Sequence, residues 1–211
     1  MLRLAPGPVV HLVGGAAGPL GGDDLVLDVT VGDGATLVVR GVAAMLAQPG
    51  VDPDERGRLS IRATVGEGAT LDWDPEPTIL VAGCRLDLDV TIDAAADACV
   101  RWSEELVLGR SGEESGEVVA RTRAVVGGRL ALDHAMTVGG PPGPWDGPGG
   151  LAGHRWIGTV LHLGESVPEP VAPCADAAVR AAGLVLAAGG VLRVATAVDR
   201  RHGRPVLLAE G

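Results

Sequence analysis

Two acidic segments carry the residue types from which catalytic or metal-binding sites are built. In the segment 73–79, Asp74 and Glu76 each precede a proline, which disfavours the α region and predicts an extended backbone. In the second segment, Glu104 and Glu105 stand beside a tryptophan, and one of two adjacent side chains on a strand points inward. Paired carboxylates serve as general acid and base in glycosidases, or as oxygen ligands for a cation. Prolines and an inward charge also protect an edge strand against aggregation, so a purely structural role is an open alternative.

Histidine and cysteine are too scattered to form a recognisable motif. The five histidines show no HxxH, HxxxH or HExxH spacing, and only His154 and His162 have a separation that suits one strand face. The cysteines Cys84, Cys99 and Cys174 form no CxxC pair, which indicates reduced thiols rather than a disulfide framework. No GxSxG motif is present for a serine hydrolase. A metal site that gathers histidine and Cys174 from distant positions is an open alternative.

The composition excludes several classes of function. The chain of 211 residues contains no Lys, Asn, Phe or Tyr, and all 17 basic residues are Arg. Without Lys there is neither a Walker A motif nor a Schiff base, which excludes P-loop NTPases and pyridoxal-phosphate enzymes. With only four Trp and no Phe or Tyr, the chain offers no stacking platform for single-stranded nucleic acid. The net charge of −10 opposes nucleic acid and suits a cationic partner, although a solubilising acidic surface is the commoner explanation.

Alternating hydrophobicity predicts a fold dominated by β-strands. Apolar residues occupy every second position in residues 25–31, 60–65 and 85–92, with charged or hydroxyl residues between them. Each of these segments therefore has one face for a core and one face for solvent.

The turns between these strands repeat. Residues 31–37 (VGDGATL) return almost unchanged as residues 65–71 (VGEGATL), and weaker copies follow at residues 95–100 and 126–130. Glycine supplies the positive φ that a tight turn needs before a new strand begins. Four such units at similar spacing predict stacked layers, as in a β-solenoid or an elaborated β-sandwich.

The second half of the chain is less regular. Residues 139–150 contain ten Gly or Pro residues and are predicted as a surface loop that could contact a partner. Residues 155–163 and 191–198 are predicted strands, and the alanine-rich segment 175–188 is a predicted helix. We expect one domain over residues 1–211, with no transmembrane helix or signal peptide and with the cytoplasm as its location.

Several short motifs, each weak alone, occur in an order that resembles one known family. They are Gly18-Pro19-Leu20-Gly21-Gly22-Asp23, Gly34-Ala35, Trp73-x-Pro75-Glu76-Pro77-x-Ile79, Gly83-x-Arg85, Trp102-x-Glu104, Gly109-Arg110 and Gly116-Glu117. This ordered set, which spans about residues 14–200, resembles the urease accessory protein D family (UreD, also called UreH).

The resemblance implies a non-enzymatic chaperone with an irregular, β-helix-like stack of strands and one or two short helices. It implies binding to apo-urease and to a UreF-like protein, which recruits a UreG-like GTPase that carries nickel. It further implies that nickel moves through a water-filled passage, with no tightly bound cofactor. We place the acidic residues of the motifs, Asp23, Glu76, Glu104 and Glu117, along that passage. Scattered carboxylates suit such transit, because a Cys/His cage would hold nickel too tightly.

The chain departs from the family pattern at residues 40–50, where Arg40-Gly41-Val42-Ala43-Ala44-Met45-Leu46 replaces a polar segment. This difference predicts altered partner specificity. The sequence alone leaves two other functions open. One is a hydrolase on a β-solenoid that uses Glu76 or Glu104 as acid and base. The other is a β-rich binding module with no role in metal handling.

Overall fold

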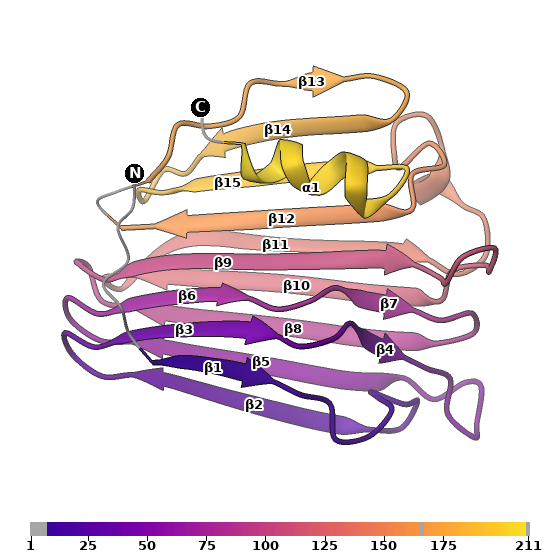
Figure 1. Ribbon diagram of the computed structural model, residues 1–211, viewed down its shortest axis with the longest axis horizontal. Helices are drawn as coiled ribbons and strands as arrows, with labels where there is room; N and C mark the ends of the chain where they lie inside the picture. Colours follow the sequence, from indigo (N-terminus) through magenta and orange to yellow (C-terminus); the bar gives the residue numbers. More distant parts are fainter. Residues whose placement is uncertain (1–7, 165–166, 210–211) are drawn as a thin grey trace.

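The computed structural model describes residues 8–164 and 167–209, whose strands form two facing sheets (Figure 1). The ten-stranded sheet contains β1 (Val9–Leu12), β3 (Thr36–Gly41), β4 (Met45–Ala47), β6 (Thr70–Asp74), β7 (Thr78–Leu80), β9 (Cys99–Leu108), β12 (Trp156–Leu163), β13 (Cys174–Ala175), β14 (Val179–Val185) and β15 (Val191–Ala197). The five-stranded sheet contains β2 (Asp24–Val31), β5 (Gly57–Val65), β8 (Arg85–Ala94), β10 (Glu117–Val126) and β11 (Arg129–Gly139). A 3-10 helix, η1 (Pro144–Asp146), lies in the Pro/Gly-rich loop, and the α-helix α1 is Arg200–Leu208. The prediction of an all-β stack with short helices is confirmed.

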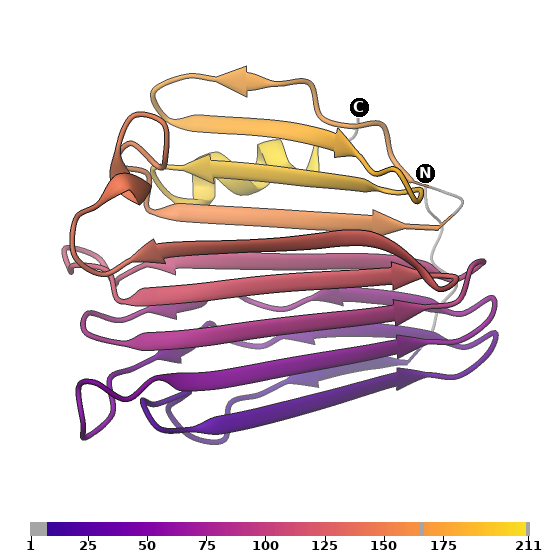
Figure 2. The ribbon, with the colours of Figure 1, turned by 180° about the vertical axis from the view of Figure 1, so that it is seen from behind.

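The first half of the chain winds as a β-solenoid. Each coil runs along the five-stranded sheet, turns a corner and continues in the ten-stranded sheet (Figure 2). As a result β2, β5, β8 and β10 pair in parallel, and so do β1, β3, β6 and β9. The repeated turns stack on one another, since Val31 pairs in register with Val65. Gly34 and Gly68 have φ of +66° and +59° at equivalent corners, a conformation that side chains other than glycine rarely adopt.

Two expectations for the second half of the chain are corrected. The turn at residues 126–130 starts no further coil, because it closes an antiparallel hairpin between β10 and β11. The predicted helix at residues 175–188 is wrong, because half of this segment forms β14, which pairs antiparallel with β15. Alanine has the highest helix propensity of any residue, but such propensities are small, and pairing with a neighbouring strand outweighs them. The strands predicted at residues 155–163 and 191–198 are confirmed as β12 and β15.

The main core lies between the two sheets. Alternate residues of both sheets point into it, as the hydrophobic pattern predicts. Because β6 and β9 are parallel and in register, Trp73 pairs with Trp102. Their stacked rings have centroids 4.6 Å apart and an interplanar angle of 3°. Trp73 lines the larger and Trp102 the smaller of the two cavities described in the next subsection.

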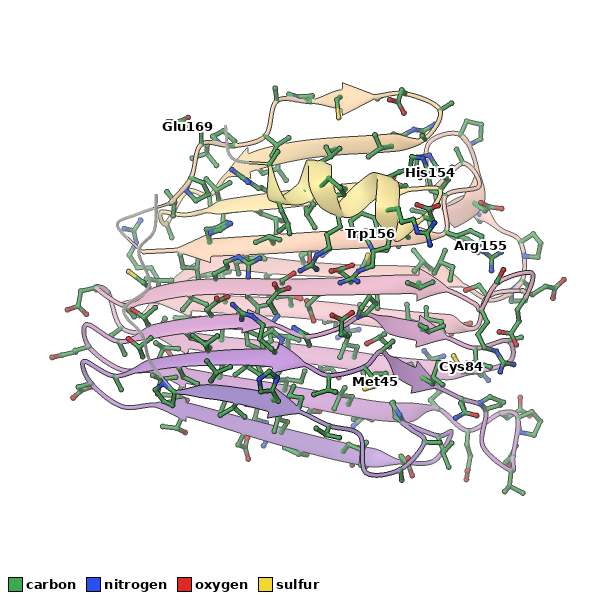
Figure 3. The ribbon with its side chains drawn as sticks, in the orientation of Figure 1. Met45, Cys84, His154, Arg155, Trp156 and Glu169 are labelled. Atoms are coloured by element: carbon green, nitrogen blue, oxygen red, sulfur yellow. The ribbon has the colours of Figure 1, made fainter. Side chains whose placement is uncertain are left out.

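Helix α1 packs against β12 and β15 on the outer face of the ten-stranded sheet (Figure 3). The carboxylate of Asp199 caps the helix by accepting the backbone N–H of His202 at 3.0 Å. Gly203 of α1 and Gly158 of β12 both lie against the indole of Trp156, and a Cβ at either position would overlap the ring. The sequence did not reveal this helix, since Gly203 and Pro205 both disfavour helical structure.

We predict that Gly203→Ala lowers the free energy of unfolding by about 1–3 kcal/mol, because the new methyl group overpacks the contact with Trp156. Urea unfolding measures the change. Gly149→Ala is the matched control, since an added Cβ there meets no atom within 4 Å. Equal loss of stability in both variants would contradict the prediction.

Candidate functional site

Three successive coils interrupt the ten-stranded sheet at the same level. The breaks lie at residues 13–17 after β1, at residues 42–44 between β3 and β4, and at residues 75–77 between β6 and β7. Pro75 and Pro77 have no N–H to donate, so they cannot continue the hydrogen-bond ladder. In the next coil β9 runs without a break and closes the opening.

A cavity of about 600 Å³, called the inter-sheet cavity below, lies between the sheets at these breaks. Its floor consists of leucine and isoleucine side chains from β2, β5 and β8. Its rim includes the small residues Ala43 and Ala44 of the second break and Glu76 of the third. Of the four carboxylates predicted from the sequence, Asp23, Glu76 and Glu104 line this cavity. The structure therefore gathers three residues that are distant in sequence.

Glu104 points between the two sheets, and within the described residues it forms no ion pair. It projects from β9 toward the five-stranded sheet, and its carboxylate accepts the hydroxyl of Thr122 at 3.1 Å. Burial raises the pKa of Glu104 to about 7, and the Thr122 hydrogen bond offsets only part of that effect. Glu104 is half-buried, and because a carboxylate withdrawn from bulk water without a cation is costly, this position favours either a proton or a bound positive charge.

Glu104 also borders a second, smaller cavity of about 30 Å³, which has room for about two water molecules. Thr122 and His134 line this space as well, and they are directly opposite each other on β10 and β11. Trp102 forms another wall, and its indole N–H is buried without a hydrogen bond of normal geometry among the described residues. The Trp102 side chain nevertheless acts to lower the pKa of Glu104, and a polar wall of this kind suits bound water.

The other three predicted carboxylates have partners. Glu76 is half-buried and forms an ion pair with Nη1 of Arg200 at 3.2 Å. Asp23 accepts the backbone N–H of Leu20 at 2.8 Å, which stabilises the turn before β2. Glu117 forms an ion pair with Arg56 and borders a separate groove, so the structure does not bring it to the other three.

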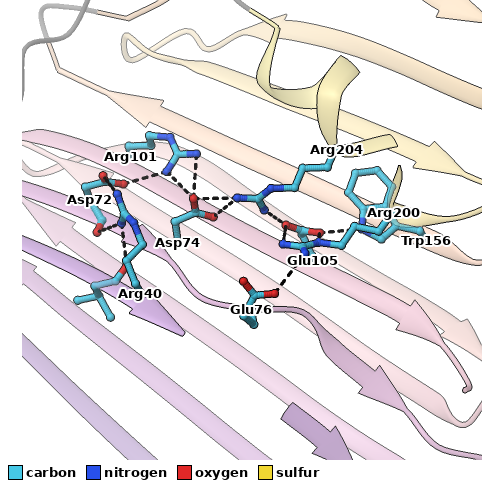
Figure 4. A network of polar contacts seen from close by, with 10 residues as sticks. Arg40, Asp72, Asp74, Glu76, Arg101, Glu105, Trp156, Arg200 and Arg204 are labelled. Carbon is cyan, nitrogen blue, oxygen red and sulfur yellow. Dashed lines mark hydrogen bonds and ion pairs between the residues drawn. The ribbon is translucent and has the colours of Figure 1, made fainter. Parts of the chain in front are cut away.

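The outer face of the ten-stranded sheet holds a network of ion pairs that the sequence did not reveal (Figure 4). Its carboxylates are Asp72, Asp74, Glu76 and Glu105, and its arginines are Arg40, Arg101, Arg200 and Arg204. Glu105 is buried and is bound by two arginines of α1 and by the indole N–H of Trp156 at 2.9 Å.

The split of the adjacent pair, with Glu104 inward and Glu105 outward, follows the alternation of a strand as predicted. Burial acts to raise the pKa of Asp74, but Arg101 and Arg204 lower it below its usual value. The carboxylates of the outer face are therefore held as charged partners of arginine, in contrast to Glu104.

Other residues considered from the sequence do not form a site. His154 binds the hydroxyl of Thr196 through Nδ1 at 2.8 Å, and it lies before β12 rather than on it. Burial, followed by the charge of Arg101, lowers the pKa of His162 to about 4. Within residues 8–164 and 167–209, no three His, Cys, Asp or Glu residues are arranged to hold a metal ion. In the same residues no helix has the length and apolarity needed to cross a membrane.

Comparison with known proteins identifies related chains. A family model described as UreD urease accessory protein matches residues 3–207. The urease accessory protein UreD of Parafrankia sp. (strain EAN1pec) is 42% identical over 181 residues, which cover 86% of this chain and 59% of that protein. UreD of Streptomyces coelicolor is 43% identical over 166 residues, covering 77% of this chain and 65% of its own length. UreD 3 of Streptomyces griseus is 38% identical over 200 residues, which cover 94% of this chain and 78% of that protein. The chain thus spans about three fifths of the length of the first two relatives.

The position of Glu104 predicts how stability depends on pH. A carboxyl whose pKa is raised on folding favours the folded state at low pH, and this advantage is lost as the pH rises through about 7. Glu104→Gln imitates the protonated form, so its stability relative to wild type should increase by about 1–3 kcal/mol between pH 5 and pH 8. Urea unfolding at both pH values measures this difference.

Glu117→Gln is the control, because Glu117 lies outside the cavity and is paired with Arg56. It should show no such gain at pH 8. If the free energies of unfolding of wild type and Glu104→Gln changed equally with pH, the prediction would be wrong, because folding would then leave the pKa of Glu104 unchanged.

Proposed function

Because the chain belongs to the UreD family of urease accessory proteins, we propose that it assists the maturation of a urease and is not itself an enzyme. In this proposal the protein is a cytoplasmic chaperone that binds apo-urease. It also binds a UreF-like protein and, through it, a UreG-like GTPase. The names of the relatives support the maturation role, and the partners follow from the resemblance of the sequence motifs to the family.

We further propose that nickel passes through the protein by way of the inter-sheet cavity. Ni²⁺ is the cargo of this step and is not a resident cofactor. Asp23 and Glu76 offer oxygen atoms at the larger cavity, and Glu104 borders both the larger and the smaller one. Nickel ranks high in the order of divalent affinities, so isolated carboxylates and water favour release where thiolates and imidazoles would retain it. Glu117 lies outside this route and has no part in the proposal.

The single observation that supports the proposal most is the environment of Glu104. The carboxylates of the outer face are bound by arginine, whereas Glu104 lies between two cavities and, within the described residues, has neutral partners only. A divalent cation with its water would provide the charge that this site lacks. A hydrolase would need two available carboxylates, and Arg200 already binds Glu76.

Maturation of urease tests the role of Glu104. Urease co-expressed with Glu104→Gln and the other accessory proteins should contain several-fold less nickel at limiting nickel, because the variant keeps the shape of the site but loses its charge. Glu117→Gln should support normal nickel content. Pull-down of urease and the UreF-like partner from the same sample checks assembly, which both variants should retain.

Two results would contradict the passage. Full nickel content with Glu104→Gln would remove Glu104 from the route. Failure of both variants to assemble with urease would indicate that these carboxylates serve binding of partners and not transit.

Binding of Ni²⁺ to the purified protein should be weak, with a Kd of about 10 μM or above, since the cavity offers only scattered oxygen ligands. Trp73 and Trp102 border the cavities, so their fluorescence should fall when Ni²⁺ occupies them. Glu104→Gln should reduce this quenching. A tight stoichiometric site with a nanomolar Kd would instead indicate a stable metal centre.

A further inference from the structure

Glu76, at the rim of the inter-sheet cavity, already has a cation beside it. Its carboxylate lies 3.2 Å from Nη1 of Arg200, which comes from the start of α1 (Figure 4). Glu76 stands between Pro75 and Pro77, so its backbone is restrained to an extended conformation. The pair therefore joins the cavity rim to the helix that covers the outer face of the sheet.

Arg200 is held in place independently of Glu76. Its Nε donates to Glu105 at 2.7 Å, and its Nη2 donates to the same carboxylate at 3.3 Å. Since the guanidinium group is planar and rigid, these two contacts leave Nη1 directed toward Glu76. Glu105 is itself fixed by burial and by contacts with Arg204 and Trp156.

This arrangement makes the electrostatic environment of Glu76, at the rim of the cavity, different from that of Glu104, between the sheets. A cation that reaches Glu76 meets the fixed positive charge of Arg200, whereas a cation that reaches Glu104 meets none within the described residues. Like charges within a few ångströms oppose each other, and the effect is moderate because both partners at the rim are half-exposed. Occupancy of Glu76 by a cation is therefore weakened, while Glu104 keeps its full attraction.

We propose that Arg200 is a positioning residue that competes with the incoming cation for Glu76, so that the cation is not trapped at the rim. This inference rests on the proposed passage of nickel. It gives α1 a role beyond packing, because the helix presents the competing charge. It also means that displacement of α1 would turn the rim into a stronger cation site.

Removal of Arg200 tests the proposal with Ni²⁺ alone. Arg200→Gln leaves Glu105 bound by Arg204 and Trp156, so the helix keeps its main contacts. Titration of the purified full chain with NiCl₂, followed by calorimetry and tryptophan fluorescence, should show about threefold to tenfold tighter binding at low salt. In the double variant Glu76→Gln/Arg200→Gln the gain should disappear. Arg62→Gln, which breaks an exposed pair with Asp28 on the five-stranded sheet, should bind as wild type does.

Unfolding by urea checks that each variant is folded. If Arg200→Gln unfolds, Arg200→Lys serves in its place, because lysine keeps a charge near Glu105 but lacks the fork that directs Nη1. It should bind Ni²⁺ more tightly than wild type, and again only while Glu76 is present.

The outcomes separate this inference from the proposed function. Unchanged affinity in the Arg200 variants, or a gain that persists without Glu76, overturns the role of Arg200 while Glu104-dependent quenching upholds the passage. If Ni²⁺ quenches the tryptophan fluorescence of wild type and Glu104→Gln equally, the proposed passage of nickel is overturned. The proposed competition between Arg200 and the cation then fails as well.

Discussion

The structure depends on the parallel, in-register pairing of backbone groups between successive coils. This pairing requires corners of equal shape, which explains why nearly the same glycine turn stands before β3 and again before β6. Where a coil cannot form these hydrogen bonds, the sheet is interrupted. Pro75 and Pro77 cannot donate to the ladder, and the breaks of two earlier coils lie beside them, so the sheet opens there and a cavity remains. The cavity thus lies where the strands of three coils are interrupted.

The same alternation separates two kinds of carboxylate. Residues that point outward from β6 and β9 meet arginines of neighbouring strands and of α1, and they are held as ion pairs. Arginine suits this task because its planar fork binds one carboxylate with two nitrogens and still reaches a second one, as Arg200 does. Glu104 points inward, beyond the reach of that network, and its partners among the described residues are neutral side chains. The outer pairs attach α1 to the sheet, while the inner carboxylate forms no ion pair within the described residues.

The sequence predicts those parts of the fold that follow from local pattern. Alternating residues define the strands and their inner faces, and the repeated turn reveals the stacking of coils. It cannot distinguish a corner from a hairpin at residues 126–130, because both need the same glycine conformation. It assigns residues 175–188 to a helix because the segment is rich in alanine, and nothing within the segment itself signals the antiparallel pairing with β15 that makes β14. Within the candidate site, the extended backbone at Glu76 and the inward direction of Glu104 can be predicted from the neighbouring residues. The Arg200 contact joins positions more than a hundred residues apart and has no local signal.

Passage of nickel through the protein requires a divalent cation to occupy the space between the sheets at Glu104. Crystals of the protein soaked in NiCl₂, with anomalous diffraction measured at the nickel edge, test this claim directly. We predict an anomalous peak in the inter-sheet cavity within coordination distance of the Glu104 carboxylate, and its loss in crystals of Glu104→Gln. Nickel found only on surface histidines such as His11 or His202, with the same peaks in both proteins, would contradict passage of nickel through the inter-sheet cavity.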